Sequence, residues 1–183
     1  MENVASNVSA GKPKTTGAIW AAPKGSTLPT DTTTALDAAF KCLGYCSDDG
    51  LTNSTDLESE TIKAWGGDTV LTIQTSKEDK FGFTLIEVLN EDVLKFVFGS
   101  NNVSGDLATG LTVTSNNADV EEVALVIDMI MRDNTAKRIV IPDCKISEFG
   151  DVVYSDSEAV GYEVTVTCMP DSSGNAHYEY LLA

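Results

Sequence analysis

Hydrophobic and polar residues alternate with a period of two along several stretches of the chain. Residues 122–132 form the longest stretch, with apolar side chains at every second position: Val123, Leu125, Ile127, Met129 and Met131. Glu122, Asp128 and Arg132 are among the residues opposite them. Residues 160–169 repeat the pattern, since Glu163, Thr165 and Thr167 alternate with Tyr162, Val164 and Val166. Because successive side chains of a strand point to opposite faces, both stretches are predicted to be half-buried strands.

Residues 69–85 show the pattern of two short strands joined by a turn. In residues 69–76, Leu71 and Ile73 lie on one face, and the polar residues Thr72, Gln74 and Ser76 lie on the other. The charged run at residues 77–80 resembles a turn, and Phe81, Phe83 and Leu85 then resume the apolar face. The sequence therefore predicts a hairpin that turns at residues 77–80.

Residues 47–68 have almost no apolar content and separate a predicted strand at 41–46 from the one at 69–76. Structureless loops longer than about 12 to 15 residues are uncommon in compact domains and are usually functional or disordered. Trp65, followed by Gly66 and Gly67, offers a large apolar surface beside a flexible turn. We therefore interpret residues 47–68 as a long loop that contacts another molecule.

The remaining pattern predicts a mainly β protein with one helix. Further strands are expected at residues 17–23, 111–114, 136–142, 145–149 and 175–182. Asn90 can cap a helix that carries an apolar stripe and ends at Gly99. Residues 1–16 are polar and are interpreted as a flexible N-terminal arm. The expected fold is one domain, residues 1–183, a β-sandwich or partly closed barrel with one flanking α-helix.

The charge of the chain limits its partners. The formal net charge is -16 and the isoelectric point is near 4.2. Attraction to a nucleic acid backbone requires clustered Lys and Arg, so specific DNA or RNA binding is disfavoured. The longest apolar stretch, residues 123–131, is interrupted by Asp128, and no signal peptide or membrane span is expected.

No group of residues predicts catalysis or a cofactor. The four cysteines, Cys42, Cys46, Cys144 and Cys168, lie in or beside apolar runs, as buried reduced thiols commonly do. The only histidine is His177, so neither a zinc site nor a Ser-His-Asp triad is favoured. The acidic residues between 48 and 58 lack the ligand spacing of an EF-hand loop, and a solvated loop or subunit contact is preferred over calcium binding. We expect a protein that is not an enzyme.

Several segments together resemble the tail tube proteins of long-tailed, siphovirus-type bacteriophages. The resemblance rests on residues 44–52 and 63–73, and on Ala35-Leu36-Asp37-Ala38-Ala39-Phe40, Arg138-Ile139-Val140-Ile141-Pro142-Asp143, Tyr154-Ser155-Asp156 and Met169-Pro170-Asp171. It covers nearly the whole chain.

The resemblance implies a structural virion protein whose stacked hexameric rings form the tail tube. Sheets from six subunits would join into an inner barrel, and DNA would pass through its acidic lumen without specific binding. The implied partners are further copies, a tape-measure protein, a tail terminator and baseplate or distal tail proteins, with no membrane. Assembly would occur in the host bacterial cytoplasm, and the product would be located in the virion tail.

Two sets of residues are candidates for these roles. Polar faces of the best alternating strands suggest lumen-facing residues: Thr72, Gln74, Asp128, Glu163, Thr165 and Thr167. The long loop suggests subunit-interface residues: Asp48, Asp49, Leu51, Asp56, Leu57 and Trp65. Two other functions remain open, a carbohydrate-binding or adhesive β-sandwich and the tube subunit of a contractile injection or secretion system.

Overall fold

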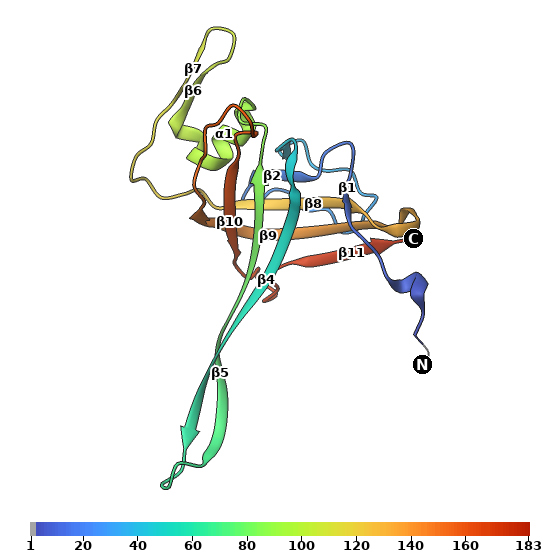
Figure 1. The fold of residues 1–183 in the computed structure, drawn as a ribbon, viewed down its shortest axis with the longest axis vertical. Coiled ribbons are helices and arrows are strands. Elements are labelled where there is room, and N and C mark those ends of the chain that lie inside the picture. The colour runs from blue at the N-terminus through green and yellow to red at the C-terminus, as the bar shows by residue number, and fades with distance from the viewer. Residues whose placement is uncertain (1–2) are drawn as a thin grey trace.

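The computed structural model describes residues 3–183 and is dominated by antiparallel strands (Figure 1). The strands are β1 (Lys12–Pro13), β2 (Ile19–Pro23), β3 (Lys41–Cys42), β4 (Cys46–Lys63), β5 (Thr69–Leu85), β6 (Val103–Asp106), β7 (Gly110–Val113), β8 (Val123–Ile130), β9 (Ala136–Phe149), β10 (Tyr162–Cys168) and β11 (Tyr178–Leu182). Among the described residues there is one α-helix, α1 (Glu91–Phe98), and there are three short 3-10 turns, Ala5–Asn7, Ser100–Asn102 and Arg132–Asn134. The prediction of a mainly β fold with a single flanking helix is confirmed.

Nine strands belong to one sheet that bends along β9. The order is β3-β2-β8-β9-β10-β5-β4, with β1 added beside β8 and β11 beside β9. The first part of β9, residues 136–140, pairs with both β8 and β11, whereas residues 144–149 pair with β10. In Figure 1, β8, β9 and β11 run across the view, and β10, β5 and β4 run along its long axis. The sheet therefore folds into two layers whose strands cross at a steep angle, as in orthogonal β-sandwiches.

The main core lies between these two layers and α1. Phe81, Phe83 and Leu85 of β5 point inward and are buried, as are Val164 and Val166 of β10. The helix covers one side through Val93, Phe96 and Val97, and the rings of Phe83 and Phe96 stack at 6.3 Å. The period-two pattern of β10 is confirmed, because Glu163 is exposed while its neighbours Val164 and Val166 are buried.

The helix begins and ends where its sequence signals predict. The Asn90 side chain accepts a hydrogen bond from the backbone N–H of Asp92 at 3.0 Å, which satisfies one of the free amides of the first turn. Gly99 follows the last residue with φ of 91°, a conformation that costs other residues steric strain. The first turn also carries Glu91 and Asp92, whose negative charges favour the helix dipole.

The expected turn at residues 77–80 is wrong, and so is the expected loop at 47–68. β5 is continuous from Thr69 to Leu85, and β4 runs beside it up to Lys63, so the chain turns only at residues 64–68. Both strands of this hairpin are exposed on both faces over most of their length. Without a buried face there is no selection for alternating apolar residues, and the polar run gives no strand signal.

The N-terminal segment was expected to be a flexible arm, but part of it is hydrogen-bonded to the body of the protein. Lys12 and Pro13 pair with Ile130 and Met129 of β8, and the backbone N–H of Arg132 donates to the Ser9 hydroxyl at 2.8 Å. Residues 3–13 are nevertheless exposed, and the part of the expectation that concerns residues 1–2 lies outside the described residues.

The four cysteines are unpaired thiols within the described chain. Burial raises the pKa of Cys46 to about 11 and the pKa of Cys168 to about 12, so these thiols are protonated and unreactive near neutral pH. Cys144 is fully buried, and burial raises its pKa as well.

Candidate assembly surfaces

The outer face of β9-β10-β5-β4 is polar from edge to edge. The register aligns two rows across the four strands, Glu148-Thr165-Gly82-Thr52 and Lys145-Thr167-Lys80-Ser54. Hydroxyl groups join neighbouring strands, since Thr167 donates to the Ser147 hydroxyl at 2.9 Å and Ser147 donates to the carbonyl of Thr165 at 3.2 Å. The opposite face of the same strands is the apolar core, so this sheet presents one polar surface to its surroundings.

Charges of both signs lie on this polar face. Lys80 contacts Asp56 at 3.0 Å and Glu78 at 3.6 Å, and the hydrogen bond with the Asp56 carboxylate raises the pKa of Lys80. Glu148 and Glu163 are exposed, and Lys145 is half-buried. The face is therefore acidic overall but contains lysine at defined positions.

Both lateral edges of this four-stranded sheet are open. Within the described residues, β4 pairs only with β5, and residues 145–149 of β9 pair only with β10. Unpaired edges expose backbone N–H and C=O groups that can bond another strand. Between Cys46 and Leu51 the β4 edge bulges outward and carries the exposed residues Asp48 and Asp49.

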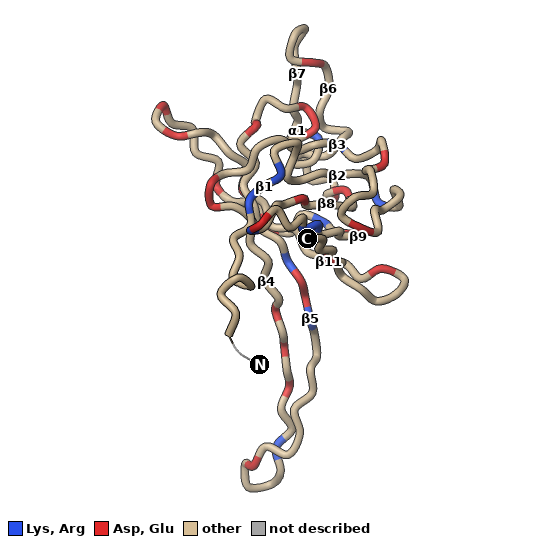
Figure 2. The backbone as a smooth tube through the Cα atoms, turned by 90° about the vertical axis from the view of Figure 1, so that its right-hand side faces the viewer, with Lys and Arg blue, Asp and Glu red and all other residues tan. Residues whose placement is uncertain are grey.

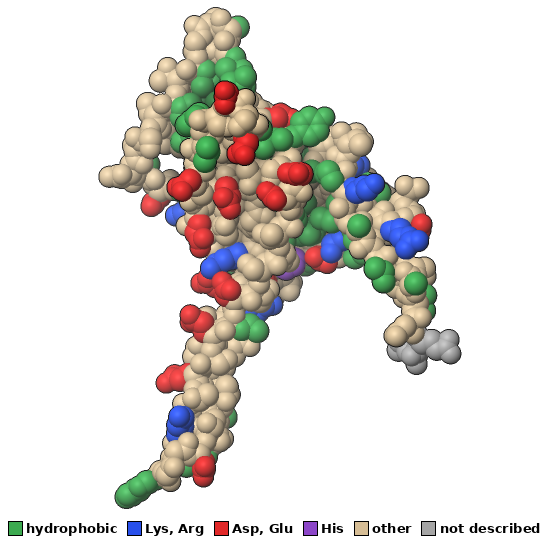
Figure 3. Space-filling model, viewed as in Figure 1, with side chains coloured by type: hydrophobic (Ala, Val, Ile, Leu, Met, Phe, Trp, Pro, Cys, Tyr) green, Lys and Arg blue, Asp and Glu red, His purple; other side chains and the backbone are tan. Residues whose placement is uncertain are grey.

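The hairpin of β4 and β5 extends far beyond the body of the protein. We call residues 57–77 the arm; it projects as a two-stranded ribbon in Figures 1 and 2. With about ten residues in each strand at roughly 3.3 Å per residue, the arm is about 30 Å long. Trp65 lies in the turn at its tip and is fully exposed. Figure 3 shows hydrophobic side chains at the end of the arm.

The root of the arm is held by a buried carboxylate. Asp79 is 5% exposed; it accepts a hydrogen bond from the Thr55 hydroxyl and lies 3.6 Å from the Lys77 ammonium group. The Nδ1 atom of His177 lies 3.7 Å from Asp79, and the His177 ring packs edge-on against Phe81. These contacts connect both strands of the arm to the segment that leads into β11.

The predicted lumen residues lie in three places: the polar sheet face, the arm and, for Asp128, the interior. Glu163, Thr165 and Thr167 lie together on the polar sheet face, as expected. Thr72 and Gln74 are exposed but belong to the arm, away from that sheet.

The structure corrects the prediction for Asp128, because its side chain is buried and not exposed on a polar face. The Arg138 guanidinium group donates to both carboxylate oxygens, at 2.6 and 2.9 Å, and Lys14 lies 3.7 Å away. Arg138 also donates to the backbone carbonyls of Asp31 and Thr34, which fastens the segment at residues 26–40 over β8 and β9. Both faces of β8 are covered in the structure. The sequence did not indicate this, because a charged residue such as Asp128 in an alternating strand is typical of a solvent-facing position.

The predicted interface residues are mostly available for contact. Leu57 and Trp65 are exposed on the arm, and Asp48, Asp49 and Asp56 lie along the β4 edge. Leu51 is the exception, because it packs against the subunit's own core beside Phe83. The other five remain predicted interface residues.

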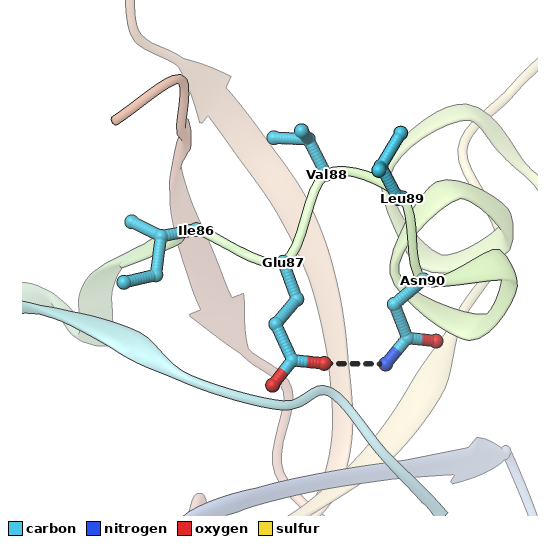
Figure 4. A pocket seen from close by; sticks show the side chains of 5 residues that line it. All are labelled: Ile86, Glu87, Val88, Leu89 and Asn90. Carbon is cyan, nitrogen blue, oxygen red and sulfur yellow. Dashed lines mark hydrogen bonds between the residues drawn. The ribbon is translucent and has the colours of Figure 1, made fainter. Parts of the chain in front are cut away.

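A hollow lies between β5 and α1, lined by Ile86, Glu87, Val88, Leu89 and Asn90 (Figure 4). The Glu87 carboxylate accepts hydrogen bonds from the backbone N–H of Tyr45 at 2.9 Å and from the Asn90 amide at 3.1 Å. A Cβ at Gly44 would collide with this carboxylate, so glycine is required for the close approach. The polar groups of the hollow are used internally, and the hollow presents no set of groups for a ligand.

Residues 3–183 contain no group of three or more His, Cys, Asp or Glu side chains placed to hold a metal ion. In the same residues, no helix has the length and apolar character needed to cross a membrane.

A polar sheet with two open edges, together with a projecting arm, is typical of structural β-proteins that assemble with copies of themselves. The family model of phage tail tube proteins matches residues 5–182, and the chain therefore belongs to the phage tail tube protein family. The comparison with curated proteins gave no match. The protein is thus a structural component of a phage tail that assembles into a tube, which confirms the resemblance seen in the sequence.

Proposed function

We propose that six copies form a closed ring in which their four-stranded sheets join edge to edge around a central channel. The open β4 edge of one copy pairs with residues 145–149 of β9 in the next copy. The observation that supports this arrangement is the presence of two free edges on one sheet whose outer face is polar throughout.

Strand direction favours this pairing. All neighbouring pairs from β9 to β4 are antiparallel, so β4 runs opposite to β9 within one copy. Rotation about a ring axis preserves each strand's direction along that axis. The β4 edge therefore meets the next β9 in the antiparallel orientation, and the alternation continues around the ring.

The polar sheet face then lines the channel, with Glu163, Thr165 and Thr167 facing its interior. Six chains of net charge -16 carry -96 formal charges, and a wall of this sign repels phosphate. DNA leaving the capsid passes along such a wall without a specific binding site. The lysines at positions 80 and 145 moderate the repulsion locally.

Rings stack into the tube through the arm, whose root continues the channel-lining strands β4 and β5. A tape-measure protein inside the tube, a tail terminator at one end and baseplate or distal tail proteins at the other complete the assembly, which forms in the host cytoplasm. Contractile systems use related tubes, and the features above suit either tail type. The family match favours a tail tube over an adhesive β-sandwich.

Disulfide cross-linking tests the ring. Thr52 and Glu148 occupy the same row at opposite edges of the sheet, so T52C/E148C places cysteines on facing edges of neighbouring copies. Oxidised tubes should give a covalent ladder that ends at six subunits. S54C/E148C and D56C/E148C test pairings in which β4 is shifted by two or four residues along the neighbouring β9. The wild-type protein, with its four native cysteines, is the control. Tubes that give no ladder with any of the three variants would refute the edge pairing.

A charge change tests the channel wall. Glu163→Lys adds two positive charges per chain, or twelve per ring, at a position where phosphate would pass. DNA release from complete particles should slow, and more strongly at low salt because screening is weaker. Asp119→Lys, an equal charge change at an exposed site outside the four-stranded sheet, is the matched control. Equal release rates for the two variants at low salt would place Glu163 away from the channel.

A further inference from the structure

The two faces of the arm differ in chemistry. Pairing places Glu60 opposite Ile73 and Ile62 opposite Leu71. An extra residue in β5, Thr75, shifts the register, so that Glu58 lies on this same face opposite Ser76. We call the set Glu58, Glu60, Ile62, Leu71 and Ile73 the docking face. The reverse face has no carboxylate, with Ser59 and Thr61 opposite Gln74 and Thr72, and with Leu57 opposite Lys77 near the root of the arm.

The docking face is largely exposed, and its one side-chain hydrogen bond among the described residues is donated by the Ser76 hydroxyl to Glu58 at 3.1 Å. Ile62, Leu71 and Ile73 are 45%, 51% and 46% exposed, and neither Glu58 nor Glu60 forms an ion pair within residues 3–183. A two-stranded ribbon is only marginally stable in water without packing on a face. Aliphatic side chains beside carboxylates that lack a cationic partner among the described residues suit a surface that is both apolar and basic.

Such a surface occurs at the end of the sheet where β1, β8, β9 and β11 meet. Leu181 lies opposite Lys137 in the register, Lys137 lies opposite Met129, and Met129 lies opposite Pro13. Leu181 and Leu182 are 60% and 52% exposed. The adjacent row, Lys12-Ile130-Ala136-Leu182, points to the other face of the sheet. We call the set Lys12, Met129, Arg132, Lys137, Leu181 and Leu182, drawn from both faces at this end of the sheet, the basic end. Figure 3 shows hydrophobic and basic side chains together on this side of the molecule, opposite the acidic side of the arm.

The positive charges of the basic end are only partly neutralised. Lys137 contacts Glu179 at 2.9 Å, and Arg132 lies 3.9 Å from Asp133. Lys14 points to the buried Asp128, whereas Lys12 has no ion pair among the described residues. Lys12 and Arg132 are therefore the groups best placed to receive an outside carboxylate.

We infer that the docking face of one copy binds the basic end of a copy in the adjacent ring. The inference rests on the proposed tube and adds the surface that receives the arm. The arm continues β4 and β5, and strands of a barrel tilt by roughly 35° to 45° from its axis, so the arm leaves its own ring through one face. Glu58 and Glu60 then meet Lys12 and Arg132, while Ile62, Leu71 and Ile73 cover Leu182, which lies on the same face of the sheet as Lys12. Complementary charge sets the orientation and the apolar contact excludes water.

Charge exchange between two variants tests this contact. E58K/E60K and K12E/R132E should each form rings but lose tubes, because each places like charges at the interface. Mixed in equal amounts, the two variants should again form tubes, with rings of the two kinds alternating. Negative-stain microscopy and sedimentation measure the outcome, and circular dichroism shows whether each variant is folded.

A matched pair of variants separates the docking face from charge in general. E58Q/E60Q removes two negative charges and S59K/T61K adds two positive charges, so both shift the net charge by +2, on opposite faces of the same ribbon. The first should reduce tube length and sedimentable protein, and the second should leave both close to wild type. Tubes formed by E58K/E60K alone, or a mixture no better than its components, would overturn the inference while leaving the proposed tube intact. Wild-type protein that forms neither rings nor tubes would instead refute the proposed function, and this inference with it.

Discussion

One strand, β5, passes through two environments. Residues 81–85 lie in the core, where Phe81, Phe83 and Leu85 are buried and alternate with half-exposed Gly82 and Thr84. Residues 69–75 lie in the arm, where every side chain is exposed. The backbone pairing is the same in both parts, but the burial that stabilises them differs. The core half is held by its own chain, and the arm half is exposed on both faces.

The largest expected effect is at Phe81, in the core half. Removing this fully buried ring leaves a cavity, and Phe81→Ala should lower the free energy of unfolding by about 3–5 kcal/mol. Ile73→Ala, in the exposed half of the same strand, should change it by less than about 0.5 kcal/mol. Urea unfolding of assembly-incompetent protein measures both. Equal losses would mean that the arm packs on the body in solution.

The next effect is expected at Asp128, which the sequence pattern places on a polar face and the structure buries. Asp128→Ala leaves the Arg138 guanidinium group buried without its charge partner, and a loss of about 3–5 kcal/mol is expected. Glu163→Ala, on the exposed face of β10, is the control and should cost less than about 0.5 kcal/mol. A small effect at Asp128 would show that the side chain is solvated after all.

Excision of the arm should lower the free energy of unfolding less than the two substitutions above, and it should abolish tube formation. Glu58 pairs with Ser76, so residues 59–75 can be replaced by an Asn-Gly turn that closes the hairpin there. The free energy of unfolding should change by less than about 1 kcal/mol because no core residue is removed. Rings should remain and tubes should be absent under the microscope. Normal tubes from this variant would exclude the arm as a stacking element.

The smallest expected effect on stability is at Asp31. This residue begins the turn at residues 31–34, whose carbonyls accept hydrogen bonds from Arg138. Its carboxylate accepts hydrogen bonds from the backbone N–H groups of Thr33 and Thr34, and these bonds lower its pKa from 3.8 to about 2. A lowered native pKa stabilises the fold above pH 3.8, and this contribution is lost as the pH falls towards 2. Asp31→Asn should therefore flatten the decline of thermal stability between pH 4 and pH 2, relative to wild type. An unchanged profile would show that the turn does not depend on this carboxylate.

The sequence was informative wherever a strand has one buried and one solvated face. The polar and apolar faces of β10 and the capped helix α1 could be predicted, because local pattern and burial agree there. The arm as a whole could not. Its β5 half alternates at residues 69–76, but its β4 half carries no periodic signal, and the charged run at residues 77–80 resembles a turn. Asp79 in that run is a buried contact at the root of the arm.

The sequence by itself determined the mainly β class, the acidic character, the single helix and the family. These properties depend on composition, on local periodicity and on short segments whose residues are adjacent in the chain. Only the tertiary structure decided that residues 46–85 form one long hairpin whose far part is the arm, that Asp128 is paired with Arg138, and that the four-stranded sheet has two open edges. Each of these depends on contacts between residues distant in sequence, where pairing partners and covering segments determine which polar side chains are buried and which remain free for another copy.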